Sequence, residues 1–217
     1  PAEEARPFYT EVYRDENVLI ADKFAGVNTE ALAAHLARTC GARAVHRLDR
    51  NTCGLLAFAL NGEAERALLA AFRGRTVRKV YEAVCLHPFA QKRASLHAYL
   101  TKDAKKAEVR VFSQPRAGAL PIATEYEVLE ERGGLARVQI VLHSGRTHQI
   151  RAHMAFIGHP VLGDEKYGDE AANRRYGVKR QLLVAKRLSF ACEGALASLG
   201  GREFVSAFSA EFPAPKG

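Results

Sequence analysis

The stretch from His46 to Gly54 places several charged side chains directly before an apolar run. That run covers residues 55–60 and is short and continuous, which predicts a buried strand. A buried strand does not need two arginines, a histidine and an aspartate at its end, whereas a site for an anionic substrate does. A carboxylate such as that of Asp49, held between apolar walls, stays ionised only if a cation pairs with it. An aspartate in a loop is more often a turn or cap residue, and that interpretation stands beside the functional one.

Charge and composition restrict the partners of this chain. Its 217 residues carry a formal net charge of +8 and a pI of about 9.5, which favours a polyanionic partner such as nucleic acid. Hydrophobic residues make up 47%, enough for a sizeable core, and no run approaches the roughly 20 apolar residues of a membrane span. No signal peptide is visible, and the four cysteines form neither a Cys-x-x-Cys pair nor a zinc pattern. We therefore expect a cytoplasmic protein with reduced thiols and no membrane association.

Two later stretches also mix charged and apolar residues. One is the Lys-x-Tyr segment at 79–84, and the other covers residues 145–154 and continues over 158–164. Taken in order with the His-Arg-Leu-Asp segment at 46–49, they resemble the motifs of the RluA-type pseudouridine synthases, and the resemblance spans roughly residues 11–190. The chain departs from the family pattern at Phe24, Cys53 and Val184, where the family has Pro, Ser and His.

The sequence pattern predicts one α+β domain over residues 1–217, built on antiparallel sheet with helices outside it. The resemblance implies a mixed, mostly antiparallel, curved sheet with flanking helices and a basic central cleft. Family members often carry a small RNA-binding domain at the N-terminus, and none is expected in this chain. The implied partner is structured RNA, either rRNA or tRNA, bound by a monomer that uses no cofactor.

The resemblance also implies the catalytic residues. Asp49 takes the position of the nucleophile that attacks a flipped-out uridine while the bond between base and sugar is cleaved. Tyr81 takes the position of the aromatic residue that stacks on the base and can remove a proton from its carbon 5, although a tyrosine in a strand is more often a core residue. Arg151 takes the position of the arginine that pairs with the nucleophile, although a solvated helix arginine is the plainer interpretation.

A wider set of residues is predicted to contact RNA. By resemblance, Arg47 fills the gap in the RNA stack that the extruded uridine leaves. The basic run at 73–79 adjoins Tyr81, which favours phosphate contact over a merely solvated face. The full set predicted to bind RNA is His46, Arg47, Arg50, Thr52, Arg75, Lys79, Arg146, His148 and Gln149.

Three alternatives remain open. His143, His148 and His153 recur every five residues, but that spacing suits one metal poorly and no acidic ligand adjoins them, so we expect no metal. Cys53 with His46 could serve a cysteine hydrolase, although no Gly-rich oxyanion element is evident. A protein that binds RNA without catalysis is the third, and the presence of Asp49 argues against it.

Local patterns predict most of the elements. Strands are expected as a pair over 8–23 and at 55–60, 80–86 and 108–112, followed by a hairpin of 124–130 and 136–142 around a Gly-Gly turn. Helices are expected over 30–39, 61–72 and 148–157, capped by Thr29, Asn61 and Thr147. Residues 88–107 are expected as a loop, with late strands at 182–184, 187–190 and 203–208.

Overall fold

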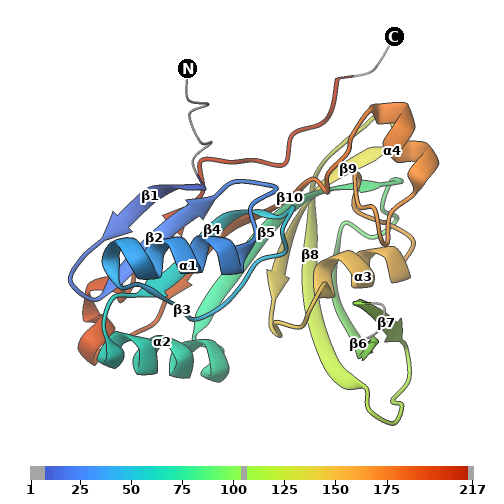
Figure 1. Cartoon of the computed structure of the whole chain (residues 1–217). Coiled ribbons are helices and arrows are strands. Elements are labelled where there is room, and N and C mark those ends of the chain that lie inside the picture. Colours follow the sequence, from blue (N-terminus) through green and yellow to red (C-terminus); the bar gives the residue numbers. More distant parts are fainter. Residues whose placement is uncertain (1–7, 104–106, 215–217) are drawn as a thin grey trace, which may run out of the picture. The chain divides into compact units, whose positions relative to one another are not determined.

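A computed structural model describes residues 8–103 and 107–214 of the chain. They form two compact units, and the chain passes between the units after residues 78, 184 and 208. The first unit holds residues 8–78 and 185–208, and the second holds 79–103, 107–184 and 209–214. Figure 1 labels most of the helices and strands of both. The prediction of a single domain is not decided by this grouping and stays a prediction.

The first unit is built on the strand order β1–β2–β4–β10, with β3 paired to β4 and β11 paired to β10. The β1–β2, β2–β4, β3–β4 and β10–β11 pairs are antiparallel. The bounds of these strands are β1 (Tyr9–Arg14), β2 (Val18–Lys23), β3 (Arg43–Ala44), β4 (Cys53–Ala59), β10 (Leu183–Phe190) and β11 (Glu203–Val205).

Three helices complete the first unit: α1 (Thr29–Cys40), α2 (Gly62–Gly74) and the 3-10 helix η1 (Gly194–Leu199). Alternate residues of β2 and β4 join α2 and η1 in one apolar cluster, because successive side chains of a strand point to opposite faces. Val18, Leu55, Leu68 and Leu199 lie in this cluster and are fully buried. This apolar cluster includes residues of β4, the strand that directly follows the charged residues at 46–50 and the turn after them.

The second unit has the strand order β5–β9–β8–β6–β7, and all four neighbouring pairs are antiparallel. Helix α3 packs on β7 and β8, where Ala152 joins a small apolar cluster with residues of β6, β7 and β8. The bounds are β5 (Val77–Leu86), β6 (Arg93–Asp103), β7 (Glu108–Phe112), β8 (Leu120–Arg132), β9 (Leu135–Leu142), α3 (Gln149–Phe156) and α4 (Glu170–Tyr176).

The predicted α+β class, with mostly antiparallel sheet and flanking helices, is confirmed. The predicted strand pair at 8–23, the strand before residue 60 and the hairpin around Gly133 and Gly134 are also confirmed. The basic central cleft stays a prediction. No helix in the described parts of the chain is long and apolar enough to cross a bilayer.

Several local predictions were wrong. Most of the predicted loop at 88–107 is strand β6, and the two late strands at 182–184 and 187–190 are one strand, β10. The N-cap of α1 is Asn28, whose side chain accepts from the Glu30 N–H, while Thr29 is buried. The N-cap of α3 is His148, with left-handed backbone and no capping bond, so Thr147 is not the cap. Asn61 caps α2 as predicted.

Gly54, the first buried residue of β4, is a position that only glycine fits. Its φ is +112°, and a Cβ atom there would lie 2.4 Å from the Ala185 carbonyl oxygen. Gly41 also has positive φ, at +69°, but a Cβ atom there would meet nothing within 4 Å. A substitution at Gly41 therefore introduces backbone strain alone, whereas a substitution at Gly54 also introduces a clash with the Ala185 backbone.

We expect Gly41→Ala to lower the free energy of unfolding by about 1–2 kcal/mol, the cost of a left-handed alanine. Gly54→Ala should cost more than about 3 kcal/mol, because β4 must also move away from β10. Urea denaturation of both variants measures the difference. Equal losses would show that the Ala185 backbone yields without cost.

Candidate functional site

The loop that carries Asp49 connects β3 to β4 in the first unit. Leu48 is buried, and the Thr29 hydroxyl donates to its carbonyl at 2.8 Å and accepts from its N–H at 3.2 Å. The Asp49 carbonyl accepts from the Thr52 N–H at 3.1 Å, which closes a turn around the aspartate. The Asp49 carboxylate is therefore half-buried on a loop whose two flanks are fixed to the start of α1 and to β4.

A fully buried lysine, Lys23 at the end of β2, lies against this loop. Its ammonium donates to the backbone carbonyls of Phe24 at 3.1 Å, Val27 at 2.9 Å and Arg50 at 3.2 Å. The Gly26 N–H adds a bond of 2.9 Å to the same Arg50 carbonyl. The Lys23 ammonium thus links the 24–27 turn by hydrogen bonds to Arg50, the residue that follows Asp49.

Burial lowers the pKa of Lys23 to about 8, while electrostatic interactions with Cys53 and Asp49 oppose the shift. The charged ammonium therefore costs free energy in the fold and is retained because three carbonyl groups accept its hydrogen bonds and the Asp49 carboxylate lies near it. Asp49 and Lys23 are close enough to interact electrostatically. The cation is thus part of the surroundings of the predicted nucleophile.

The predicted RNA-binding residues of the first unit divide into inward and outward positions. Thr52 is buried, and His46 is half-buried, stacked on Phe72 at 4.2 Å with its Nε2 accepting from the Ala57 N–H at 2.9 Å. Arg47, Arg50 and Arg75 are exposed. Thr52 and His46 therefore hold the loop in shape, whereas the three arginines face solvent.

The cysteine hydrolase alternative loses support from the geometry of Cys53. Burial raises the pKa of this thiol to about 11, with the nearby Asp22 carboxylate adding to the shift. A hydrolase needs the thiolate, and such a thiol is almost wholly protonated at neutral pH. His46 uses its Nε2 to accept from the β4 backbone, so that nitrogen is already engaged.

Lys79 and Tyr81 lie at the start of the part of β5 that belongs to the second unit, two residues apart and on the same face. Tyr81 pairs with Ile140 of β9 and is only 9% exposed. Lys79 places its ammonium next to Gly145, where a Cβ atom would approach it to 3.2 Å. The strand thus brings the Lys79 ammonium beside the loop that precedes α3, with Tyr81 two residues along on the same face.

That loop, residues 143–148, is held by the buried side chain of Gln149. The Gln149 Oε1 accepts from the Ser144 hydroxyl at 2.9 Å and the Arg146 N–H at 3.1 Å. Its Nε2 donates to the Ala123 carbonyl at 3.1 Å and the Thr124 hydroxyl at 3.0 Å. The amide oxygen and the amide nitrogen of Gln149 each have two hydrogen-bond partners within the protein. This favours a positioning role over direct RNA contact.

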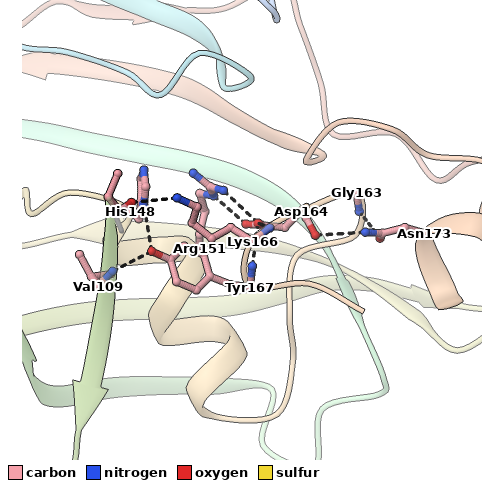
Figure 2. Close-up of polar contacts among 9 residues, drawn as sticks. Val109, His148, Arg151, Gly163, Asp164, Lys166, Tyr167 and Asn173 are labelled. Carbon is pink, nitrogen blue, oxygen red and sulfur yellow. Dashed lines mark hydrogen bonds and ion pairs between the residues drawn. The ribbon is translucent and has the colours of Figure 1, made fainter. Parts of the chain in front are cut away.

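Arg151 lies in the first turn of α3, as predicted, but it is buried and is therefore not a solvated helix arginine. Its guanidinium donates twice to Asp164, from Nε to Oδ2 at 2.6 Å and from Nη2 to Oδ1 at 2.9 Å (Figure 2). Burial alone would raise the pKa of the Asp164 carboxyl, but Arg151 and two backbone N–H groups hold it below its ordinary value. The pair is thus fully ionised at neutral pH.

Tyr167 covers the other side of this arginine, with the Arg151 guanidinium carbon 5.3 Å from the ring centroid. Its hydroxyl accepts from the Val109 N–H at 2.9 Å and lies 2.9 Å from His148 Nδ1 (Figure 2). The hydroxyl can therefore donate its proton to an unprotonated Nδ1. His148, predicted to contact RNA, is half-buried and linked to β7 through this tyrosine.

The other two histidines of the five-residue series have separate partners. His143 Nε2 lies 2.9 Å from a Glu125 carboxylate oxygen, and His153 Nδ1 lies 3.0 Å from the Thr124 hydroxyl. Burial lowers the pKa of His153 to about 4, so it is neutral at pH 7. Within the described residues, no group of three or more His, Cys, Asp or Glu side chains is arranged to hold a metal ion.

Sequence reasoning did not identify Lys23, Asp164 or Tyr167 as parts of these clusters. Asp164 directly follows Gly163 in the 158–164 stretch, and Lys23 lies three residues before Gly26, which is the signal that could have found them. Burial was the missing information, because charged residues are almost never buried without partners. Tyr167 carries no sequence signal beyond its place three residues after Asp164.

Comparisons with known proteins agree on one family. Residues 18–156 match the family model described as RNA pseudouridylate synthase. Ribosomal large subunit pseudouridine synthase C of Vibrio cholerae is 33% identical over 193 residues, covering 82% of this chain and 60% of that protein. A tRNA pseudouridine synthase C of Haemophilus ducreyi is 34% identical over 209 residues, covering 82% of this chain and 84% of that protein.

A solved structure supports the same relationship. Human RNA pseudouridylate synthase domain containing 1 superposes with a TM-score of 0.79 at 27% identity, covering 92% of this chain and 83% of that one. The chain spans about 60% of the length of several curated relatives that it matches, the Vibrio cholerae protein among them.

The lowered pKa of Lys23 predicts how stability depends on pH. Between about pH 8 and 10.5 the unfolded lysine holds a proton that the folded one has lost, so the free energy of unfolding should rise with pH. Relative to Lys23→Met, the wild type should gain roughly 2 kcal/mol between pH 7 and pH 10.

Urea denaturation of both proteins at pH 7, 8, 9 and 10 gives this difference, and other titrating groups cancel in it. A difference that does not change with pH would show that Lys23 titrates as an ordinary lysine.

The raised pKa of Cys53 predicts slow alkylation. At pH 8 the folded thiol should hold roughly 100-fold less thiolate than the same cysteine in the urea-unfolded chain, because about two pKa units separate them. Iodoacetamide labelling followed by peptide mass spectrometry measures both rates. Folded-state labelling as fast as labelling of the unfolded chain would restore the hydrolase alternative.

Proposed function

Because this chain belongs to the RNA pseudouridylate synthase family, we propose that it is an RNA pseudouridine synthase that isomerises uridines of ribosomal or transfer RNA. The observation that carries the proposal is the family match over residues 18–156, which includes Asp49, Tyr81 and Arg151. Relatives named for ribosomal RNA and for transfer RNA both match, which is why both remain in the substrate class. The net charge of +8 suits either polyanion.

We assign Asp49 the nucleophilic role. In the proposed reaction its carboxylate attacks the nucleotide, and the bond between the uracil nitrogen and the sugar breaks. The uracil then rotates, its carbon 5 bonds to the sugar, the bond to the Asp49 carboxylate breaks, and the proton on carbon 5 leaves while nitrogen 1 takes up a proton. Two features of the loop support the assignment: its backbone is fixed by Thr29 and Lys23, and the Lys23 cation interacts with the carboxylate. A positioned, ionised carboxylate is a usable nucleophile.

Tyr81 and Arg151 have supporting roles in this proposal. The Tyr81 ring stacks on the extruded base, and its oxygen, in the phenolate form, is the candidate acceptor for the proton from carbon 5. The Arg151 guanidinium is proposed to hold the nucleophile by N–H groups outside its fork with Asp164, and its burial strengthens such bonds because little water screens them. Neither role needs a cofactor, since the reaction moves one bond within a single nucleotide.

Arg47 is the proposed residue that replaces the flipped uridine in the RNA stack. Its side chain is 69% exposed and makes an ion pair of 2.8 Å with Glu30. An exposed pair of this kind contributes at most about 1 kcal/mol, so RNA can displace Glu30 at little cost. Exposed Arg50, Arg75 and Arg146 are proposed to contact phosphates. Arginine suits both stacking between bases and binding phosphate, because its side chain is positively charged, planar and long.

The second candidate function is RNA binding without catalysis, and Asp49→Asn separates the two. Asparagine has nearly the same shape but no charge, so tritium release from RNA labelled at carbon 5 of uridine should fall more than about a thousandfold. RNA binding rests on many lysines and arginines, so its Kd should stay within about threefold. The melting temperature should stay within a few degrees.

Cys53→Ser is the matched control, since it changes the first residue of β4, directly after the same loop, and should keep nearly full turnover. Both variants and the wild type are assayed on ribosomal RNA and transfer RNA from cells lacking this protein. Tritium release by well-folded Asp49→Asn within tenfold of wild type would remove the nucleophile assignment. Binding without release by the wild type would favour the noncatalytic alternative.

A further inference from the structure

The bond between Arg151 and Asp164 is a buried fork. The Asp164 side chain is fully buried and that of Arg151 is 9% exposed. Two parallel N–H to oxygen bonds, from Nε and Nη2, fix both the position and the plane of the guanidinium (Figure 2). Asp164 therefore determines in which direction the remaining amino group, Nη1, points.

Asp164 is itself held by a rigid turn. Its carboxylate accepts from the Lys166 N–H at 2.8 Å and the Tyr167 N–H at 3.0 Å. Asn173 of α4 grips the turn from behind, accepting from the Gly163 N–H at 2.7 Å and donating to the Asp164 carbonyl at 3.1 Å (Figure 2). Gly163 has φ of +84°, and a Cβ atom there would lie 2.1 Å from the Arg180 carbonyl oxygen, so the turn has no room to shift.

Stability alone does not explain this arrangement. Removing two charges from water costs several kcal/mol for each ion, and an apolar pair of similar volume is often as stable as a buried ion pair. Removing one partner of such a pair is costly, but that cost comes from the charge left unpaired and does not show that the pair stabilises the fold. What a buried ion pair does supply is a charge at a defined place, and here the defined charge is the one proposed to serve the nucleophile.

We propose that Asp164 is a positioning residue that sets the orientation of the Arg151 guanidinium for catalysis, and that Asn173 acts through Asp164 to the same end. The inference rests on the catalytic role proposed for Arg151. Tyr167 limits the guanidinium from one face, while its hydroxyl serves a different link, from His148 to β7. The ring and the hydroxyl can therefore be tested apart.

Asp164→Asn keeps the shape of the side chain and removes its charge. We expect kcat to fall about 30- to 100-fold and KM to stay within threefold, because RNA contacts elsewhere remain. Tyr167→Phe keeps the ring over Arg151 and should change kcat less than threefold, so it is the matched control. Asn173→Ala should lower kcat about 5- to 10-fold, and it carries the test if Asp164→Asn does not fold. All rates are measured well below each melting temperature.

A double-mutant cycle with Arg151→Lys distinguishes positioning from mere structural support. If Asp164 acts through Arg151, Asp164→Asn should cost less than threefold in the Arg151→Lys background, because the forked bond is already lost. Additive losses, or Asp164→Asn with wild-type kcat beside an inactive Asp49→Asn, would overturn the inference and leave the proposed function intact.

The inference also has a readout that does not depend on activity. The Nε proton of Arg151 should give a slowly exchanging signal in nitrogen-15 NMR of the wild type and of Tyr167→Phe. It should exchange fast or shift in Asp164→Asn. If the wild type releases no tritium, the proposed function fails and this signal still tests the positioning. An unchanged Nε signal in Asp164→Asn would show that another group orients the guanidinium.

Discussion

The Lys23 ammonium, buried at the end of β2, is the interaction on which the geometry of the Asp49 loop depends. Three backbone carbonyls from two separate segments converge on it, and without the cation those oxygens would lack a common donor. Each carbonyl bond to a charged group contributes about 1.5–3 kcal/mol, more than a neutral bond does. The 24–27 turn and the Asp49 loop, 22 or more residues apart in sequence, are therefore held as one structure.

The two buried cations, one in each unit, are stabilised by different chemistry. Lys23 is a compact charge with three donors, which suits three carbonyls approaching from different directions. Arg151 is a planar fork, which suits the two oxygens of the single carboxylate of Asp164. A lysine could not replace Arg151, because it cannot form the forked bond. In both places the charge is desolvated, and the surrounding backbone becomes more rigid as a result.

Elements with strong periodicity could be predicted from the sequence, whereas those set by tertiary contacts could not. The strand pair within residues 8–23 and the hairpin at Gly133 carry local sequence signals and were predicted correctly. Strand β6 was expected to be a loop because basic residues and Pro88 obscure it, although Ala98 and Leu100 alternate toward the core. The predicted caps Thr29 and Thr147 were also wrong. The Thr29 hydroxyl bonds to the backbone of Leu48, a partner 19 residues away that no local pattern indicates.

The candidate site shows the same limit. Asp49, Tyr81 and Arg151 were named from the resemblance of their motifs to the family, and their roles remain proposals. Burial could not be read from those motifs, and burial is what distinguishes Gln149 from Arg146, four and one residues after Gly145. The first holds the loop with four hydrogen bonds, and the second faces solvent. Lys23 and Asp164 were absent from the predicted site because charge in a sequence is taken as a mark of surface.

The departures of this chain from the family pattern bear on the same lysine. Phe24 follows Lys23 directly and packs edge-on against Phe208 at 5.2 Å, and Cys53 interacts electrostatically with the ammonium. Where the family has Pro and Ser, this chain thus has an aromatic ring and a thiol, and a thiol is a weaker hydrogen-bond donor and acceptor than a hydroxyl. Less polar surroundings desolvate the lysine more strongly, which is the dominant cause of its lowered pKa. The three carbonyls therefore hold the ammonium in surroundings of low polarity, and the bond to the Arg50 carbonyl links it to the loop of the proposed nucleophile.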